Sequence, residues 1–97
     1  LITRQMTFEG KESFFINAIG EISVEILSED GNVLAKSNKF NGDSTKEFLS
    51  FENFDIKSLN NKVFRLKFSV SGKLFSFGFA DKNGNAGGAD AAGEVDS

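Results

Sequence analysis

Apolar and polar residues alternate along much of residues 21–80, and the apolar ones are mainly valine, isoleucine and phenylalanine. A period of two with these side chains is typical of half-buried β-strands, whereas little in the chain has the spacing of a helix. In residues 21–26, for example, Ser23 and Glu25 alternate with apolar neighbours. Such a strand has one buried face and one face in solvent. The pattern therefore predicts an all-β, antiparallel fold.

Turn-forming residues between alternating segments predict two hairpins. Residues 30–31, Asp-Gly, tolerate the backbone of a tight reversal, so we expect a return strand from Val33. Residues 64–70 and 75–79 alternate in the same way on the two sides of residues 71–73, Ser-Gly-Lys, which we interpret as a second hairpin. The rings expected to face the core from this hairpin are those of Phe64, Phe68, Phe75, Phe77 and Phe79.

Shorter segments predict the remaining strands. Residues 2–8 and 13–19 are expected to form two N-terminal strands, separated by the polar residues 9–12. Residues 45–51 are expected to form a strand after a turn at residues 41–44. The total is about seven short strands, at spacings typical of a sandwich or barrel. Because each strand has only one apolar face to bury, we predict an antiparallel two-sheet β-sandwich, jelly-roll-like in arrangement.

Two of these segments carry apolar residues that constrain their packing. In residues 45–51, Phe48 and Phe51 cannot both face inward on a regular pleat, so we expect a bulge or an exposed ring. Residues 53–61 are interpreted as a connection that Ile56 and Leu59 hold against the core.

The composition changes after residue 80 to Gly, Ala, Asn and Asp, with Val95 as the only branched aliphatic residue. Such a segment buries too little apolar surface to offset its ordering entropy, so residues 81–97 are expected to be a flexible tail or linker. Residues 1–80 are expected to form one β-sandwich module, large enough to fold without disulfides. Because the chain begins at Leu1 rather than Met, we expect it to be a piece of a longer protein or a trimmed precursor.

Phenylalanine is the only aromatic residue: the chain has 12 Phe and no Trp, Tyr, His, Cys or Pro. A phenylalanine ring packs well but cannot donate, accept, titrate or coordinate. Only carboxylates, lysines and hydroxyls remain for catalysis, and the chain lacks the spacing of a nucleophile elbow or phosphate loop. We therefore expect no enzyme activity from the domain by itself, and no cofactor.

The charge balance narrows the classes of partner. The chain has 11 Lys and Arg and 14 Asp and Glu, a mild excess of acidic residues. Because a nucleic-acid partner requires a clustered basic face, we expect no nucleic-acid partner. No apolar run approaches the ~20 residues that cross a bilayer, and no signal-peptide pattern is present, so we expect no membrane insertion. The absence of cysteine leaves the compartment open.

Two oxygen-rich segments are weak candidates for a metal site. Residues 81–85 place oxygen ligands at alternate positions, but Ala86 and Ala92 occupy the positions where a calcium loop needs Gly and Glu. Asp43 lies in a predicted turn, where an aspartate most simply closes its own backbone. We therefore predict no metal site and keep Asp43 as a weak candidate ligand.

Several rings lack an assured inward position, and we treat them as candidates for a ligand site or an interface. These are Phe15, Phe40, Phe51 and Phe54. Exposed rings can stack on sugars, but Phe lacks the polar edge that Trp and Tyr add. An exposed phenylalanine in a small domain more often marks contact with a neighbouring domain. We therefore favour the interface over the sugar site.

An ordered set of segments resembles a known family. It comprises the Val-Glu-Ile-Leu strand and Asp-Gly turn of residues 20–34, the Gly-Asp-Ser-Thr of residues 42–45, and the Phe-Arg-Leu-Lys-Phe strand with its continuation in residues 62–79. Residues 14–18, Phe-Phe-Ile-Asn-Ala, also resemble that family's first strand. The family is the C-terminal β-sandwich accessory module of bacterial glycoside hydrolases and sialidase-like proteins. Its members often carry Trp and Tyr where this chain has Phe within residues 48–51 and Phe75.

This resemblance implies a non-catalytic accessory module of an extracellular carbohydrate-active enzyme. Such a module supports a neighbouring catalytic domain or binds polysaccharide weakly. The alternative is a protein-protein interaction or assembly domain that acts through exposed Phe residues and sheet edges. The two hypotheses differ in whether the exposed rings meet a sugar or a protein surface.

Overall fold

The computed structural model describes residues 1–83 and 92–94. Its elements are β1 (Ser13–Ser28), β2 (Val33–Lys36), β3 (Phe40–Leu49), the 3-10 helix η1 (Ile56–Leu59), β4 (Phe64–Ala80) and β5 (Ala92–Glu94). The strands form one sheet of order β2-β1-β4-β5, and β3 pairs with β1 as well. Every pairing is antiparallel, so the all-β antiparallel class is confirmed.

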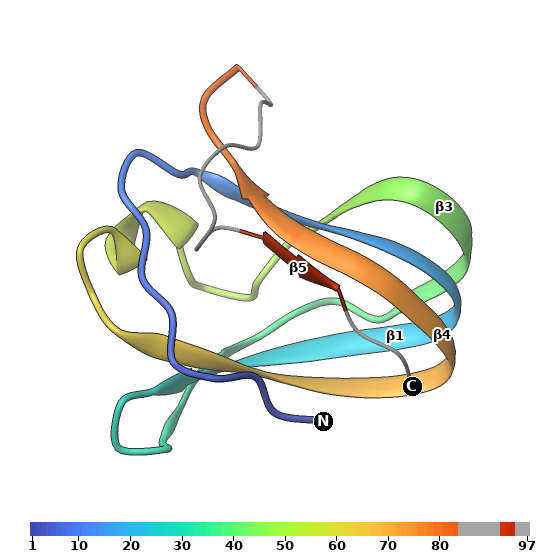
Figure 1. Cartoon of the computed structure of the whole chain (residues 1–97), viewed down its shortest axis with the longest axis horizontal. Helices are drawn as coiled ribbons and strands as arrows, with labels where there is room; N and C mark the ends of the chain where they lie inside the picture. Colours follow the sequence, from blue (N-terminus) through green and yellow to red (C-terminus); the bar gives the residue numbers. More distant parts are fainter. Residues whose placement is uncertain (84–91, 95–97) are drawn as a thin grey trace.

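Two long strands, β1 and β4, form the framework of this sheet. They pair along their whole length, from Ser13 opposite Ala80 to Ser28 opposite Phe64. Figure 1 shows both strands turning back together, so that the two arms of the sheet face each other. β3 pairs with β1 along the first arm and through the bend as far as Ile22, and β2 pairs with the second arm. The core therefore lies between two layers that belong to one continuous sheet.

The bend in both strands coincides with two glycines that face each other, Gly20 and Gly72. Their φ angles are 108° and 133°, which glycine adopts readily and other residues do not. A Cβ on Gly20 would meet the carbonyl oxygen of Ser71, and one on Gly72 would meet that of Ile19. The two backbones thus approach too closely for any side chain at either position.

The predicted second hairpin is wrong, because Gly72 lies inside β4 and not in a turn. Likewise the segments 13–19 and 21–26, predicted as separate strands, are both part of β1, and β3 runs through the turn predicted at residues 41–44. In each case a glycine that reads as a turn signal lies within a strand. The two separate sheets of about seven strands are consequently not confirmed.

A β-bulge decides which side chains of β4 reach the core. The register with β1 shifts between Asn17 and Ala18, which leaves Phe75 as the extra residue on β4. Leu74 is consequently buried, with 1% of its surface exposed, whereas Phe75 is 40% exposed. The prediction that Phe75 faces the core is wrong. The other four rings predicted there are buried, namely Phe64, Phe68, Phe77 and Phe79.

Phenylalanine rings dominate the core between the two arms. Phe14 is fully buried, and its ring centroid lies between 5.0 and 6.4 Å from four other ring centroids. These partners are Phe51, Phe68, Phe77 and Phe79. Tilted and edge-to-face pairs of this kind contribute about 0.5–1.5 kcal/mol beyond their buried area.

The first hairpin and the connection agree with their predictions. Gly31 has a positive φ of 89° in the turn between β1 and β2, and its N–H donates to the Ser28 carbonyl oxygen at 2.9 Å. In the connection, η1 forms a single turn whose residues Ile56 and Leu59 are buried. The predicted strand at residues 2–8 is limited to isolated bridges to β4.

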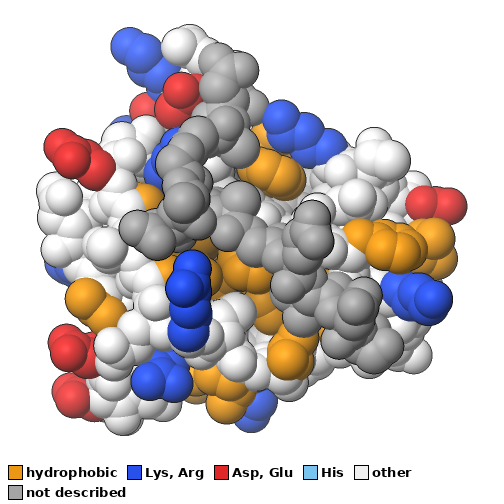
Figure 2. Space-filling view, viewed as in Figure 1, with side chains coloured by type: hydrophobic (Ala, Val, Ile, Leu, Met, Phe, Trp, Pro, Cys, Tyr) orange, Lys and Arg blue, Asp and Glu red, His pale blue; other side chains and the backbone are white. Residues whose placement is uncertain are grey.

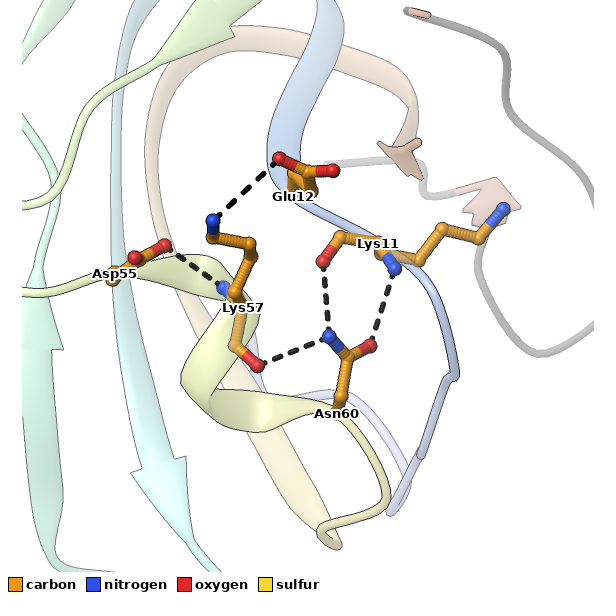
Figure 3. Close-up of polar contacts among 5 residues, drawn as sticks. All are labelled: Lys11, Glu12, Asp55, Lys57 and Asn60. Atoms are coloured by element: carbon orange, nitrogen blue, oxygen red, sulfur yellow. Dashed lines mark hydrogen bonds and ion pairs between the residues drawn. The ribbon is translucent and has the colours of Figure 1, made fainter. Parts of the chain in front are cut away.

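Asn60 ties the end of η1 to the segment before β1 (Figure 3). Its Oδ1 accepts from the Lys11 backbone N–H at 3.1 Å, and its Nδ2 donates to the carbonyl oxygens of Lys11 at 3.3 Å and Lys57 at 3.0 Å. The Lys57 Nζ also lies 3.9 Å from Glu12 Oε1, and the Asp55 side chain caps η1 by accepting from the Lys57 N–H. These contacts hold η1 over one end of the core.

Most of the predicted tail, residues 81–97, lies outside the described residues, and so does part of the weak calcium candidate at residues 81–85. Within the tail, Ala92–Glu94 form β5, which pairs with β4. These three residues extend the sheet by one short strand. The flexible tail stays a prediction for the rest of the segment.

Candidate functional site

The structure separates the four phenylalanines that the sequence offers as candidates. Phe51 is 7% exposed and belongs to the core, where its ring meets that of Phe14 at 5.8 Å. Phe40 and Phe54 are half-buried and pack against the same core. Phe15 instead lies on the outer side of β1, between two fully buried neighbours in the chain. Of the four, Phe15 is the one turned away from the core.

Phe15 forms an aromatic surface with Lys46 and Phe48 of β3. Phe48 is its direct cross-strand partner, with ring centroids 5.8 Å apart and ring planes at 62°. The Lys46 Nζ lies 5.0 Å from the centroid of Phe15 and 5.5 Å from that of Phe48, within the range of a cation–π contact. Phe48 is 46% exposed, which confirms the exposed ring expected in residues 45–51.

Gly78 of β4 fixes the Phe15 ring from the other side. It pairs directly with Phe15, and a Cβ on Gly78 would lie 2.6 Å from the tip of that ring. Gly78 is itself buried. An aromatic ring that covers a cross-strand glycine replaces the packing that the glycine lacks. The ring is thus positioned by three strands of the sheet.

We predict that Gly78→Ala displaces the Phe15 ring and destabilises the fold by about 1 kcal/mol, because the added methyl group overlaps the ring. Urea unfolding measures the stability, and the NMR shifts of the Phe15 ring report its position. Gly42→Ala is the matched control, since its Cβ would be 3.3 Å from the end of the Phe40 ring. Equal effects of the two substitutions would contradict this packing.

Sequence reasoning missed Phe48 and Lys46 as members of the site. The sequence shows that Phe48 and Phe51 cannot both face inward on a regular pleat, and the candidates drawn from it include Phe51 and not Phe48. The cross-strand partner of Phe48 depends on the register between β1 and β3. That register shifts between Ile16 and Ala18, so counting along regular strands does not bring Lys46 to both rings. The signal for the site in the sequence is that Phe48 and Phe51 cannot both face the core on a regular strand, so one of the two rings must lie outside it.

Metal-binding groups do not gather in the part of the chain that the structure describes. No cluster of three or more His, Cys, Asp or Glu side chains occurs in residues 1–83 and 92–94. Asp43 lies exposed on β3, opposite Ile19, and not in the turn predicted for it. The Asp43 candidate therefore has no ligand set among these residues.

Charged side chains are dispersed over the face of the molecule that Figure 2 shows. Figure 2 shows Lys and Arg side chains spread over the face that it views, without one basic patch. Over the described residues, no helix is long and apolar enough to span a bilayer.

A polar hollow lies on the outer side of β1 and β4 near the bend. Its volume is about 270 Å³. Its lining consists of Glu21, Ser23, Lys39, Ser69, Val70 and Ser71. Lys39 Nζ and Glu21 Oε2 form an ion pair at 3.9 Å. The lining offers hydroxyl, carboxylate and ammonium groups but no aromatic ring.

Comparisons with protein-family models, curated proteins and solved structures found no match to this chain. The resemblance to the accessory modules of glycoside hydrolases therefore stays a prediction from the sequence.

Proposed function

We propose that this domain is a non-catalytic accessory module of a carbohydrate-active enzyme, which supports a neighbouring catalytic domain by docking through the aromatic surface. The observation that carries the docking role is the exposed Phe48 ring, held against Phe15 under the Lys46 ammonium group. Aromatic residues are enriched at protein interfaces. The link to carbohydrate-active enzymes and the extracellular location rest on the sequence resemblance, and the jelly-roll-like two-sheet sandwich rests on the strand pattern of the sequence.

The geometry of the rings favours a protein partner over a sugar. The planes of Phe15 and Phe48 meet at 62°, so the two rings do not form one flat platform. Lys46 lies over both rings, where a stacked sugar would have to displace it. A protein side chain can instead fit between tilted rings and contact Lys46 at the same time. The same surface would serve an assembly domain of another protein class, which is the second candidate function.

Weak polysaccharide binding is a separate role that would use the polar hollow. Serine hydroxyls and the Glu21–Lys39 pair offer the donors and acceptors that sugar hydroxyls need. The hollow lacks a ring for stacking, and for this reason we place docking first. The two roles therefore use different residues and can be separated by substitution.

We predict that Phe48→Ala weakens docking onto the adjoining catalytic domain of the parent chain by about tenfold or more, as for loss of an aromatic anchor. Isothermal titration with that domain, produced separately, measures the change. Leu34→Ala is the matched control. Leu34 is 47% exposed, a fraction close to the 46% of Phe48, but it lies on a different strand, β2.

Docking that is equally strong in both variants, or absent in the unsubstituted domain, would refute the proposal. Affinity gels that contain soluble polysaccharides test the other role. Retardation that survives Phe48→Ala but is lost in Glu21→Ala would assign glycan binding to the polar hollow as the main function.

A further inference from the structure

The outer edge of β4 is covered by two unrelated segments of the chain. β1 pairs with its inner edge throughout. On the outer edge, the N-terminal segment bridges to Phe64 and Lys67, while β5 pairs with residues 76–78. The end of β4 therefore already receives an extended segment in antiparallel register.

The residues of β5 have a low propensity for strand pairing at this edge. β5 consists of Ala, Gly and Glu, three residues that are depleted in strands, and Gly loses the most conformational freedom on ordering. Gly93 pairs with Phe77, whose ring faces the core. Directly opposed residues lie on the same face of an antiparallel pair, so the strand offers no side chain at the position next to that ring.

We propose that residues 76–80 of β4 form a strand-addition site, from which an extended segment of a partner protein displaces β5. In this mode the main chain of the added strand supplies the hydrogen bonds and its alternate side chains supply specificity. The site is formed by the main chain at the outer edge of β4, whereas the aromatic surface is formed by side chains of β1 and β3. The Phe15 ring packs on Gly78 and borders both, so Phe48→Ala tests the aromatic surface and substitutions in β5 test the edge.

The register indicates the chemistry of the partner segment. Opposite Phe77 it carries a β-branched apolar residue, which fills the position that Gly93 leaves without a side chain. Opposite Gly78 it carries a small residue, because the Phe15 ring already covers the outer side of that glycine. Opposite Ser76, which is half-buried beside the buried Phe77, it carries a polar residue.

The test titrates the full chain, labelled with ¹⁵N, with a capped peptide of residues 90–97 that carries valine in place of Gly93. We expect amide shifts centred on residues 76–80, and binding about tenfold tighter than for the peptide with glycine, because the valine side chain becomes buried. Shifts centred elsewhere, or none at millimolar peptide, would overturn the proposal.

A locked variant tests whether β5 must leave. Ser76→Cys combined with Glu94→Cys places two cysteines at directly paired positions in a chain that has none of its own. The oxidised variant is expected to bind the valine peptide at least about tenfold more weakly than the reduced one, with Ser76→Cys alone unaffected by oxidation. Equal binding by both forms would contradict displacement.

A second variant does not depend on forming the disulfide. Gly93→Val improves the strand within the same chain, so it is expected to weaken binding of the valine peptide. Unchanged binding would contradict the proposal.

A concentration-dependent dimer that forms only in the reduced Cys variant would overturn the proposal in favour of strand exchange between two copies of the chain.

Discussion

Gly72→Ala is expected to destabilise the domain by about 3 kcal/mol or more, which is a large share of the stability of a small domain. The added Cβ would meet the Ile19 carbonyl oxygen and lie 2.9 Å from the Cα of Gly20. Both are backbone atoms, so relief requires the paired strands to separate at the bend. The φ of 133° adds strain for any residue with a side chain.

Gly31→Ala is the control that separates the two causes. Gly31 also has a positive φ, but a Cβ there would have no atom within 4 Å. We therefore expect a loss of only about 1 kcal/mol from backbone strain. Urea unfolding followed by far-UV circular dichroism suits this comparison, since the chain has neither Trp nor Tyr. Equal losses in the two variants would show that the close approach at the bend is not important.

Phe14→Ala is the second substitution with a large expected effect, a loss of about 3–5 kcal/mol in the free energy of unfolding. Phe14 is fully buried and contacts four other rings, so its removal leaves a cavity bordered by both layers of the sheet. Phe48→Ala serves as the control and should lose less than about 1 kcal/mol, because the Phe48 ring is half in solvent. A similar cost for both would mean that Phe48 is not an outer-surface residue.

The periodic pattern was sufficient to predict the class of fold, the first hairpin and most of the buried face. It predicts these because side chains at a period of two must lie on opposite faces of a strand. Gly20 and Gly72 show where the prediction failed. A glycine between two alternating segments is read as a turn, and only the pairing of distant strands shows that it allows a bend within one strand.

Strand periodicity was likewise sufficient to predict only part of the candidate site. Phe15 is outward by strand periodicity, which local sequence contains. The contact of Phe15 with Lys46 and Phe48 depends on the strand register, which shifts at two bulges opposite Asn17, one on β3 and one on β4. Such shifts depend on pairing between strands far apart in the chain, so spacing alone placed Phe75 inside and gave Phe51 no assured place in the core.

Phenylalanine is the chain's only aromatic residue, and the structure buries more than half of the 12 rings. Seven rings are buried, those of Phe8, Phe14, Phe51, Phe64, Phe68, Phe77 and Phe79. The exposed rings of Phe48 and Phe75 lie on strands of the arm that β1, β3 and β4 share. A rigid support for a few exposed groups is what the proposed docking role requires.

The most direct test of the proposed docking role is a cross-saturation NMR measurement on the labelled domain in the presence of the catalytic domain that we propose as its neighbour. The account predicts that signal loss centres on Phe15, Lys46 and Phe48 and is greatly reduced in Phe48→Ala, while Leu34→Ala keeps the original pattern. Signal loss centred on the polar hollow of Glu21 and Lys39, or none at the aromatic surface, would contradict it.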